Sequence, residues 1–319
     1  MDLIATPKNP IPLGASAGFI KGRRGAKLRF ARWPSSLRER RGTVCVFPGR
    51  AEFIEKYFEV VGELRRRGFA VAVLDWRGQG GSSRLLRDPL KGHVRSFADY
   101  DDDLARFMSE VVLPDCPPPY FALAHSMAGT VLFKAATMRG CWFSRIVMTA
   151  PMLRIAELPA SPGTISAAVW ALSLAGFGGA AVPGGEKAYL ASQVFDGNLQ
   201  TSDRERFLRN LSVVAAAPKL AVGPPTIAWL RAALGAMADI ADDSYPSRMR
   251  VPVLMLAASD DRIVSSLAIE ELAMRLKVGA QLVLRGSRHE ILQERDAIRQ
   301  QFWAAFDAFV PGAALSKAS

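Results

Sequence analysis

The chain has 319 residues, of which 50% are hydrophobic and 22% are charged. This balance excludes a disordered or fibrous protein and predicts a globular one with a large buried core. Its three cysteines, Cys45, Cys116 and Cys141, are widely spaced and form no CxxC motif. The sequence therefore predicts neither a disulfide framework nor a metal site.

The net charge of +11 is concentrated near the N-terminus. Residues 1–50 contain eleven Lys or Arg against only Asp2 and Glu39, which gives +9 for this segment. Such a segment is typical of a surface that contacts an anionic membrane, although a solubilising face explains it equally well. Nucleic-acid binding is not expected, because the chain has no zinc-finger spacing, RNP-type signature or basic helix.

Two features bear on where the protein acts. The first residues lack a basic segment followed by an apolar run of about 7 to 15 residues, so no secretory signal is predicted. The uncharged stretch 158–185 is interrupted by prolines and glycines, which makes it a poor membrane span. We expect a cytoplasmic protein with peripheral contact at the inner membrane face.

The first half of the chain alternates strand and helix patterns. Residues 18–33 alternate apolar and basic side chains around a glycine-containing turn, which predicts a hairpin at an exposed sheet edge. Residues 42–47 form an apolar β-rich run, and residues 53–67 follow with helical spacing. The pattern then repeats, with strands predicted at 70–74, 119–124 and 146–149 and an amphipathic helix at 97–112.

The pattern changes in the second half. Residues 153–245 are rich in Ala, Gly and Pro and predict an inserted, mainly helical cap. Strand patterns return at 251–257 and 280–284, and residues 290–309 predict a closing amphipathic helix. We therefore expect an α/β fold with a mostly parallel central sheet and helices on both faces. Its core comprises residues 1–152 and 246–319.

The sequence YFALAHSMAGT at 120–130 predicts a nucleophile elbow. A short strand leads into Ser126, and a helical segment follows; such a turn presents a serine hydroxyl at the carboxyl end of a sheet. Ala124 and Ala128 stand two residues before and two after the serine, where the tight turn needs small side chains. Ser126 is therefore the candidate nucleophile.

A serine hydroxyl needs a general base within hydrogen-bond reach, and the chain has only three histidines. His125 adjoins the serine, where neighbouring side chains point in divergent directions. His93 lies in a loop before a predicted helix, so we expect local structural roles for both. His289 follows the last predicted strand and is the expected base.

The carboxylate that orients the base is expected after the strand at 251–257, where Asp260 and Asp261 follow. The order Ser, Asp, His along the chain is a known one for such triads. We favour Asp261, while Asp260 can cap the helix predicted at 265–277.

The oxyanion of an acyl-transfer reaction also needs hydrogen-bond donors. The backbone N–H groups of Met127 and Arg50 are the candidates, because Met127 follows the serine and Arg50 follows an early strand-end Pro-Gly turn. The Arg50 side chain is also a candidate for binding an anionic head group.

Six segments carry a family resemblance. They are FPGRAE, DWRGQGGSS, GHVRSFADYDDDL, AHSMAG, DDRIV and GSRHEILQERD. In these segments the chain resembles the bacterial lysophospholipase L2 and monoacylglycerol-lipase-like branch, of serine aminopeptidase S33 type, in the α/β-hydrolase superfamily. The resemblance implies the α/β-hydrolase fold, a triad of Ser126, Asp261 and His289, and oxyanion positions at Arg50 and Met127. The chain departs from the family in having alanines around the serine, where glycines are usual.

Together these features predict a serine hydrolase that cleaves a lipid ester through an acyl-enzyme on Ser126, without a cofactor. The expected substrate is a small-molecule or lipid ester, and we expect its acyl chain beneath the cap, where several large aromatic side chains are available: Trp170, Phe177, Phe195 and Trp229. Two alternatives stay open: an esterase or peptidase for small soluble substrates, and a non-catalytic binding protein of the same fold. The sequence leaves the oligomeric state open.

Overall fold

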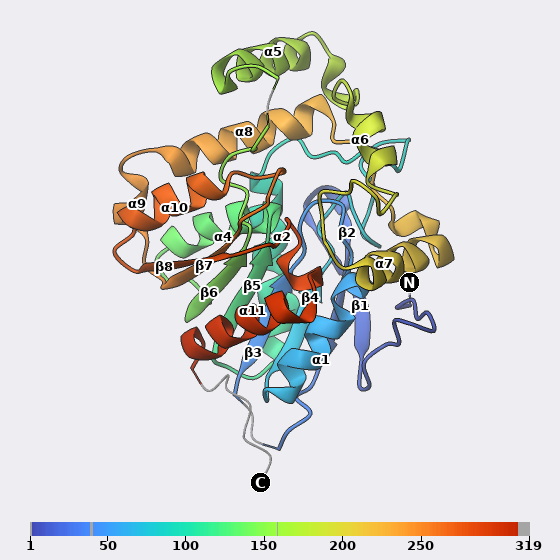
Figure 1. Cartoon of the computed structure of the whole chain (residues 1–319). Coiled ribbons are helices and arrows are strands. Elements are labelled where there is room, and N and C mark those ends of the chain that lie inside the picture. The colour runs from blue at the N-terminus through green and yellow to red at the C-terminus, as the bar shows by residue number, and fades with distance from the viewer. Residues whose placement is uncertain (1, 39–40, 158, 312–319) are drawn as a thin grey trace.

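The computed structural model describes residues 2–38, 41–157 and 159–311. Its centre is one eight-stranded sheet with the strand order β1-β2-β4-β3-β5-β6-β7-β8 (Figure 1). The strands are β1 (Ser16–Lys21), β2 (Lys27–Trp33), β3 (Thr43–Phe47), β4 (Ala70–Leu74), β5 (Tyr120–His125), β6 (Arg145–Thr149), β7 (Val253–Ala258) and β8 (Gly279–Leu284). Strand β2 runs antiparallel to β1 and β4, and the other neighbouring strands are parallel.

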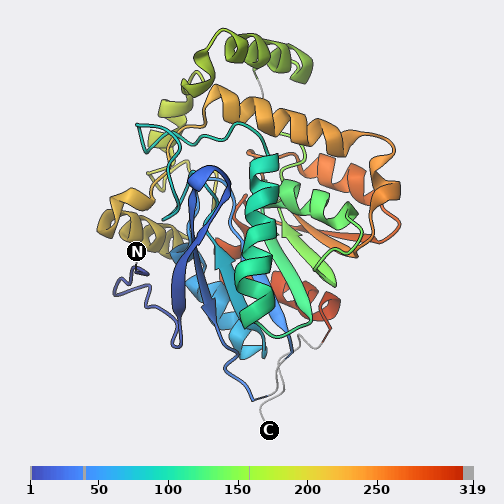
Figure 2. The same cartoon turned by 180° about the vertical axis from the view of Figure 1, so that it is seen from behind.

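Helices cover both faces of this sheet. Helices α1 and α11 lie on the face turned toward the viewer in Figure 1, and α2 and α4 lie on the face seen in Figure 2. The helices and helical turns of this part are η1 (Arg23–Gly25), η2 (Ile54–Tyr57), α1 (Phe58–Arg66), α2 (Ala98–Phe107), η3 (Met108–Val112), α3 (Leu113–Asp115), α4 (Met127–Thr137), α10 (Ser266–Arg275), η6 (Ile291–Gln293) and α11 (Asp296–Phe309). The predicted fold class is confirmed.

The connection from β6 to β7 is helical. It contains α5 (Pro162–Leu174), η4 (Phe177–Gly179), α6 (Gly185–Ala191), α7 (Arg204–Ala216), η5 (Pro218–Leu220), α8 (Ile227–Ala241) and α9 (Tyr245–Arg248). Helix α8 crosses above the sheet, and α5 lies above α8 at the top of Figure 1. The division of the chain into a core and a cap at 153–245 stays a prediction, and the outermost residues of that core, 1 and 312–319, lie outside the described residues.

The central strands of the sheet are continuous apolar runs because they are buried on both faces. Strands β3, β4 and β7 are buried along their whole length, since helices cover both faces of a parallel sheet. Because β3, β5, β6, β7 and β8 point the same way, the loops at their carboxyl ends meet along one edge. That edge is where such folds place their sites.

The N-terminal hairpin is confirmed, as β1 and β2 pair around η1 with β1 at the sheet edge. The helix predicted at 290–309 is too long, because α11 begins at Asp296 after the short turn η6. Glu290 and Glu294 cause the difference: the first binds Lys56, and the second accepts hydrogen bonds from Ser202 and the Arg288 N–H. In the described part of the chain no helix is both long and apolar enough to cross a bilayer.

Candidate active site

Ser126 lies in the sharp turn between β5 and α4, with a φ of 52° and a ψ of −117°. A positive φ is strained for a residue other than glycine. The turn is held by the Ser126 carbonyl, which accepts hydrogen bonds from the N–H groups of Gly129 and Met152 at 2.9 and 3.0 Å. Gly129 is required here, because a Cβ at this position would lie 2.6 Å from the Pro151 Cβ. The local geometry is that of a nucleophile elbow.

The two alanines near Ser126 fit inside the elbow. Ala124 and Ala128 are fully buried, and Ala124 keeps its place in the sheet opposite Phe47 and Met148. Pro151 packs against the helix at Gly129, where a side chain would not fit. The extra methyl groups therefore leave the strand, turn and helix in register.

His289 joins the other two predicted triad residues. Its Nε2 lies 2.9 Å from the Ser126 Oγ, and its Nδ1 lies 2.7 Å from the Asp261 Oδ2. The histidine comes from the loop after β8, and the aspartate comes from the loop after β7. The structure thus brings Ser126, His289 and Asp261 into one hydrogen-bonded chain, the arrangement that activates a serine hydroxyl.

The structure distinguishes between the two neighbouring aspartates. The Asp261 side chain is fully buried, and its Oδ1 accepts the N–H groups of Ile263 and Val264 at 2.8 and 2.9 Å. Burial alone raises the pKa of Asp261, but the His289 ring and these two amides outweigh it and hold the pKa below its usual range. Asp260 is exposed and accepts a hydrogen bond from the Ser259 hydroxyl. Asp261 is therefore the buried, fixed carboxylate that partners His289.

The other two histidines are held by threonines, His125 by Thr149 on the neighbouring strand β6 and His93 by Thr226 from the distant segment between β6 and β7. The Nδ1 of His125 lies 3.1 Å from the Thr149 Oγ1, and the Nδ1 of His93 lies 2.9 Å from the Thr226 Oγ1. Burial lowers the pKa of His125 to about 4 and also lowers that of His93. His125 is therefore neutral beside His289, and the centroids of these two rings are 4.8 Å apart.

The loop after β3 lies directly against the serine. A Cβ on Gly49 would be only 3.2 Å from the Ser126 Cβ, so the backbone passes close to the nucleophile. Both ends of this loop are fixed: the Gly49 N–H donates to the Glu52 carboxylate, and the Ala51 N–H donates to Gln79. The predicted oxyanion donor Arg50 lies between these two amides. The other predicted donor, Met127, opens α4, where a backbone N–H has no acceptor within its own helix.

A buried ionic cluster beside the triad was missed by the sequence analysis. The Lys56 Nζ lies 2.7 Å from the Glu52 Oε1 and 2.5 Å from the Glu290 Oε1, and the Tyr57 hydroxyl donates to Glu52 at 2.6 Å. Burial raises the pKa of Glu52, but Lys56 and His125 outweigh it, and the pKa lies at about 2. Lys56 thus links the Gly49 loop to the residue that follows His289. The i, i+4 spacing of Glu52 and Lys56 was the available signal.

A cavity of about 740 Å³ opens onto Ser126 and His289. Its apolar lining includes Met152, Ile155, Val182, Pro183, Leu199, Val222, Trp229, Ile263 and Val264. Among the aromatic residues expected around an acyl chain, Trp229 lines this cavity. Trp170 and Phe177 are exposed instead, and Phe195 packs against Phe207 with ring centroids 5.5 Å apart. Aromatic content alone did not distinguish cavity walls from the outer surface of the cap.

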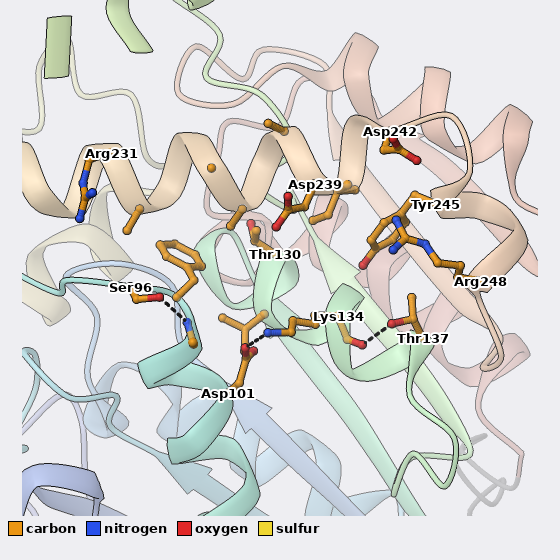
Figure 3. Close-up of a pocket in the computed structure, with 18 of the residues that line it drawn as sticks. Ser96, Asp101, Thr130, Lys134, Thr137, Arg231, Asp239, Asp242, Tyr245 and Arg248 are labelled. Atoms are coloured by element: carbon orange, nitrogen blue, oxygen red, sulfur yellow. Dashed lines mark hydrogen bonds and ion pairs between the residues drawn. The ribbon is translucent and has the colours of Figure 1, made fainter. Parts of the chain in front are cut away.

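A second cavity of about 1010 Å³ lies between α2, α4, α8 and α9 (Figure 3). Its walls carry both signs of charge, and Lys134 pairs with Asp101 at its floor. Its lining comes from residues 95–101, 130–137 and 231–248, whereas the triad opens onto the other cavity. Among the described residues no cluster of three or more His, Cys, Asp or Glu is arranged to hold a metal ion.

Fold and site together define an α/β hydrolase with a serine at its nucleophile elbow. The model of the family described as "Serine aminopeptidase, S33" matches residues 38–296. The chain is 35% identical over 287 residues to lysophospholipase L2 of Escherichia coli strain K12. This alignment covers 85% of this chain and 80% of that protein. The chain therefore belongs to the serine aminopeptidase S33 family of α/β hydrolases. Together with the 35% identical lysophospholipase, this family membership indicates a carboxylic ester hydrolase.

Solved structures agree on the fold. A soluble variant of monoglyceride lipase from Saccharomyces cerevisiae, in complex with a substrate analog, aligns with a TM-score of 0.73 at 16% identity, covering 94% of this chain and 97% of that one. Monoacylglycerol lipase of Paleococcus ferrophilus aligns with a TM-score of 0.68 at 20% identity, covering 89% and 99%. At these identities the likeness shows the α/β-hydrolase fold alone.

Proposed function

We propose that this enzyme hydrolyses lipids that carry a single ester-linked acyl chain, in a lysophospholipase or monoacylglycerol-lipase-like reaction. The observation that carries the proposal is the hydrogen-bonded chain from the Ser126 Oγ through His289 to Asp261. Ser126 and His289 face a largely apolar cavity, and the 35% identical relative is a lysophospholipase. An apolar cavity of this size suits an acyl chain.

In the proposed mechanism, the His289 Nε2 removes the proton from the Ser126 hydroxyl while the Oγ attacks the acyl carbon. The backbone N–H groups of Arg50 and Met127 hold the oxyanion that forms. His289 then gives its proton to the oxygen of the departing alcohol, which leaves an acyl-enzyme. Asp261 keeps the imidazole in the correct tautomer and stabilises its charged form.

Water completes the proposed cycle. His289 removes a proton from the water molecule as the water oxygen attacks the acyl-enzyme carbon. The second oxyanion accepts hydrogen bonds from the same two N–H groups until its bond to the Ser126 Oγ breaks. The Ser126 Oγ leaves with the proton carried by His289, so the fatty acid departs and the free enzyme is restored.

A fluorophosphonate probe tests the nucleophile. We expect the probe to label the wild type and the Ser96→Ala control, in which an exposed serine is removed, but not Ser126→Ala. Absence of label on folded wild-type protein would contradict the proposed mechanism.

The lipid assignment needs a second assay. We expect kcat/KM to rise along a series of esters of increasing acyl length, with activity on a monoacylglycerol and a lysophospholipid. Activity confined to short soluble esters or to aminoacyl anilides would support the soluble-substrate alternative instead.

We also propose that the enzyme works at the cytoplasmic side of a membrane and contacts its anionic surface peripherally. Exposed apolar side chains gather on α5, η4 and α6, where Trp170, Leu174, Phe177 and Leu190 are each more than half exposed, and α5 stands at the outer end of the molecule in Figure 1. The thiols of all three cysteines are free, which suits a reducing compartment.

Part of the basic N-terminal charge is already neutralised within the molecule. Arg23 pairs with Asp102 at 3.0 Å, and Arg32 pairs with Asp115 at 3.2 Å. The apolar surface of the cap is therefore expected to contribute to membrane binding alongside the remaining positive charge. Vesicle sedimentation at low and high salt tests this. Equal binding to neutral and anionic vesicles at both salt concentrations would remove the electrostatic contribution.

A further inference from the structure

Arg50 lines the cavity that contains Ser126 and lacks an acidic partner. Its Nη1 donates to the carbonyl of Gly223 at 2.9 Å, and its guanidinium carbon lies 5.7 Å from the centre of the Trp229 ring. Within the described residues no carboxylate forms an ion pair with it, and burial lowers its pKa to about 10. At that pKa the group is still positively charged near neutral pH.

Two other buried cations, Arg29 and Lys56, each have carboxylate partners. Arg29 is held between Glu55 and Asp75, and Lys56 lies between two glutamates. Burying a charge without a partner is costly, so proteins pair buried cations or bring them to a ligand. Arg50 lines the cavity wall and pairs with no carboxylate among the described residues, so its charge is available to an anionic ligand.

The surroundings hold the guanidinium at the wall of the cavity that also contains Ser126. Gly92 makes room for it, since a Cβ there would lie 3.0 Å from the Arg50 Nη1 and 3.1 Å from Val222. Its partners Gly223 and Trp229 come from the segment between β6 and β7, while Arg50 itself continues the loop that passes against Ser126. The side chain is therefore fixed from both sides of the cavity.

We propose that the Arg50 guanidinium binds the phosphate of a lysophospholipid and makes the enzyme prefer such lipids over neutral monoacylglycerols. The inference rests on the proposed function of the Ser126 site and names the head group that this site takes. The planar guanidinium forms paired, charge-assisted hydrogen bonds to phosphate, and Arg50 has N–H groups beyond the one that binds Gly223.

The test compares two substrates in one active site. The Arg50→Met substitution removes the charge but keeps the backbone N–H assigned to the oxyanion. Wild type and variant are assayed on a lysophosphatidylglycerol and on the monoacylglycerol with the same short acyl chain, both in monomeric solution. We take the substrate ratio as kcat/KM for lysophosphatidylglycerol divided by kcat/KM for the monoacylglycerol. We expect this ratio to fall about ten- to a hundredfold in Arg50→Met and less in Arg50→Lys.

Arg262 provides the matched control. It lines the same cavity but pairs with Glu157 at 2.9 Å, so Arg262→Met is expected to leave the substrate ratio within about twofold. An unchanged ratio in Arg50→Met would overturn the inference. A wild type that cleaves neither lipid would instead refute the proposed function, and the two failures are therefore distinguishable.

A measurement on the wild type alone covers the case in which Arg50→Met does not fold. Glycerol 3-phosphate is expected to inhibit hydrolysis of the neutral monoacylglycerol competitively, whereas glycerol at the same concentration is not. Equal inhibition by both compounds, or by neither, would contradict a phosphate site in this cavity.

Discussion

Replacement of Lys56 by methionine probes the buried cluster beside the triad. In the wild type the Lys56 Nζ lies within 2.7 Å of the Glu52 Oε1 and 2.5 Å of the Glu290 Oε1, and all three side chains are almost fully buried. Methionine has a similar length but no charge. The variant therefore leaves two buried carboxylates facing each other without a cation, and it removes the link between the Gly49 loop and the His289 loop.

The pKa of Glu52 gives the direction of the expected effect. It lies at about 2 against an ordinary value of 4.5, and a tenfold change in proton affinity corresponds to about 1.4 kcal/mol. The cluster thus favours the ionised form of Glu52, and removing one partner of a buried ion pair costs about 3 to 5 kcal/mol. Because the folded pKa is depressed, this contribution is present above pH 4.5 and is lost as the pH falls toward 2. The contribution of Glu290 to stability has the opposite sign, because its pKa is raised in the folded protein.

Urea denaturation near neutral pH measures the loss. We expect Lys56→Met to lower the free energy of unfolding by about 3 kcal/mol, and Lys134→Met, which breaks the exposed pair with Asp101, to lower it by less than about 1 kcal/mol. The double variant Lys56→Met/Glu52→Gln should recover part of the loss, because fewer carboxylates then lack a partner. A cost below about 1 kcal/mol for Lys56→Met, or strictly additive costs in the double variant, would refute the reasoning.

Three further predictions concern the elbow, the triad and the thiols. Asp261→Asn is expected to lower kcat about 10⁴-fold, while Asp260→Asn changes it by less than about twofold, and steady-state kinetics on one ester compares them. Ala128→Gly should lower the free energy of unfolding by about 1 kcal/mol, because the elbow already accommodates the alanine methyl; a clear gain in stability would contradict this. Burial raises the pKa of Cys45 well above its usual range, so Ellman's reagent should not modify this thiol at mildly alkaline pH until the protein is denatured.

Much of the candidate site could be found from the sequence because each of its parts follows a recognisable local pattern. The strand, serine and helix of the elbow are contiguous, and the turn that they form around Ser126 has the expected backbone geometry. Since only three histidines occur, elimination pointed to His289, which the structure places at 2.9 Å from the Ser126 Oγ. The catalytic roles of these residues remain proposals for the labelling and kinetic experiments.

Other features depend on contacts between segments far apart in the chain. Lys56 meets Glu290 across more than two hundred residues, and no periodicity in either segment signals the pair. The later start of the last helix has the same origin, since Glu290 and Glu294 bind distant partners. Similarly, the exposure of Trp170 and Phe177 and the burial of Trp229 depend on how the helices between β6 and β7 pack over the core.

The sequence by itself determined the alternating strands and helices, and hence the parallel sheet, the edge that carries the strand-end loops and the three triad candidates on that edge. These follow from local side-chain periodicity and from the common direction of parallel strands. Only the tertiary structure decided which aspartate faces His289, which cations have partners, and which apolar residues line the cavity. Burial and ion pairing depend on the distance between atoms in the folded chain, and local sequence patterns do not encode those distances.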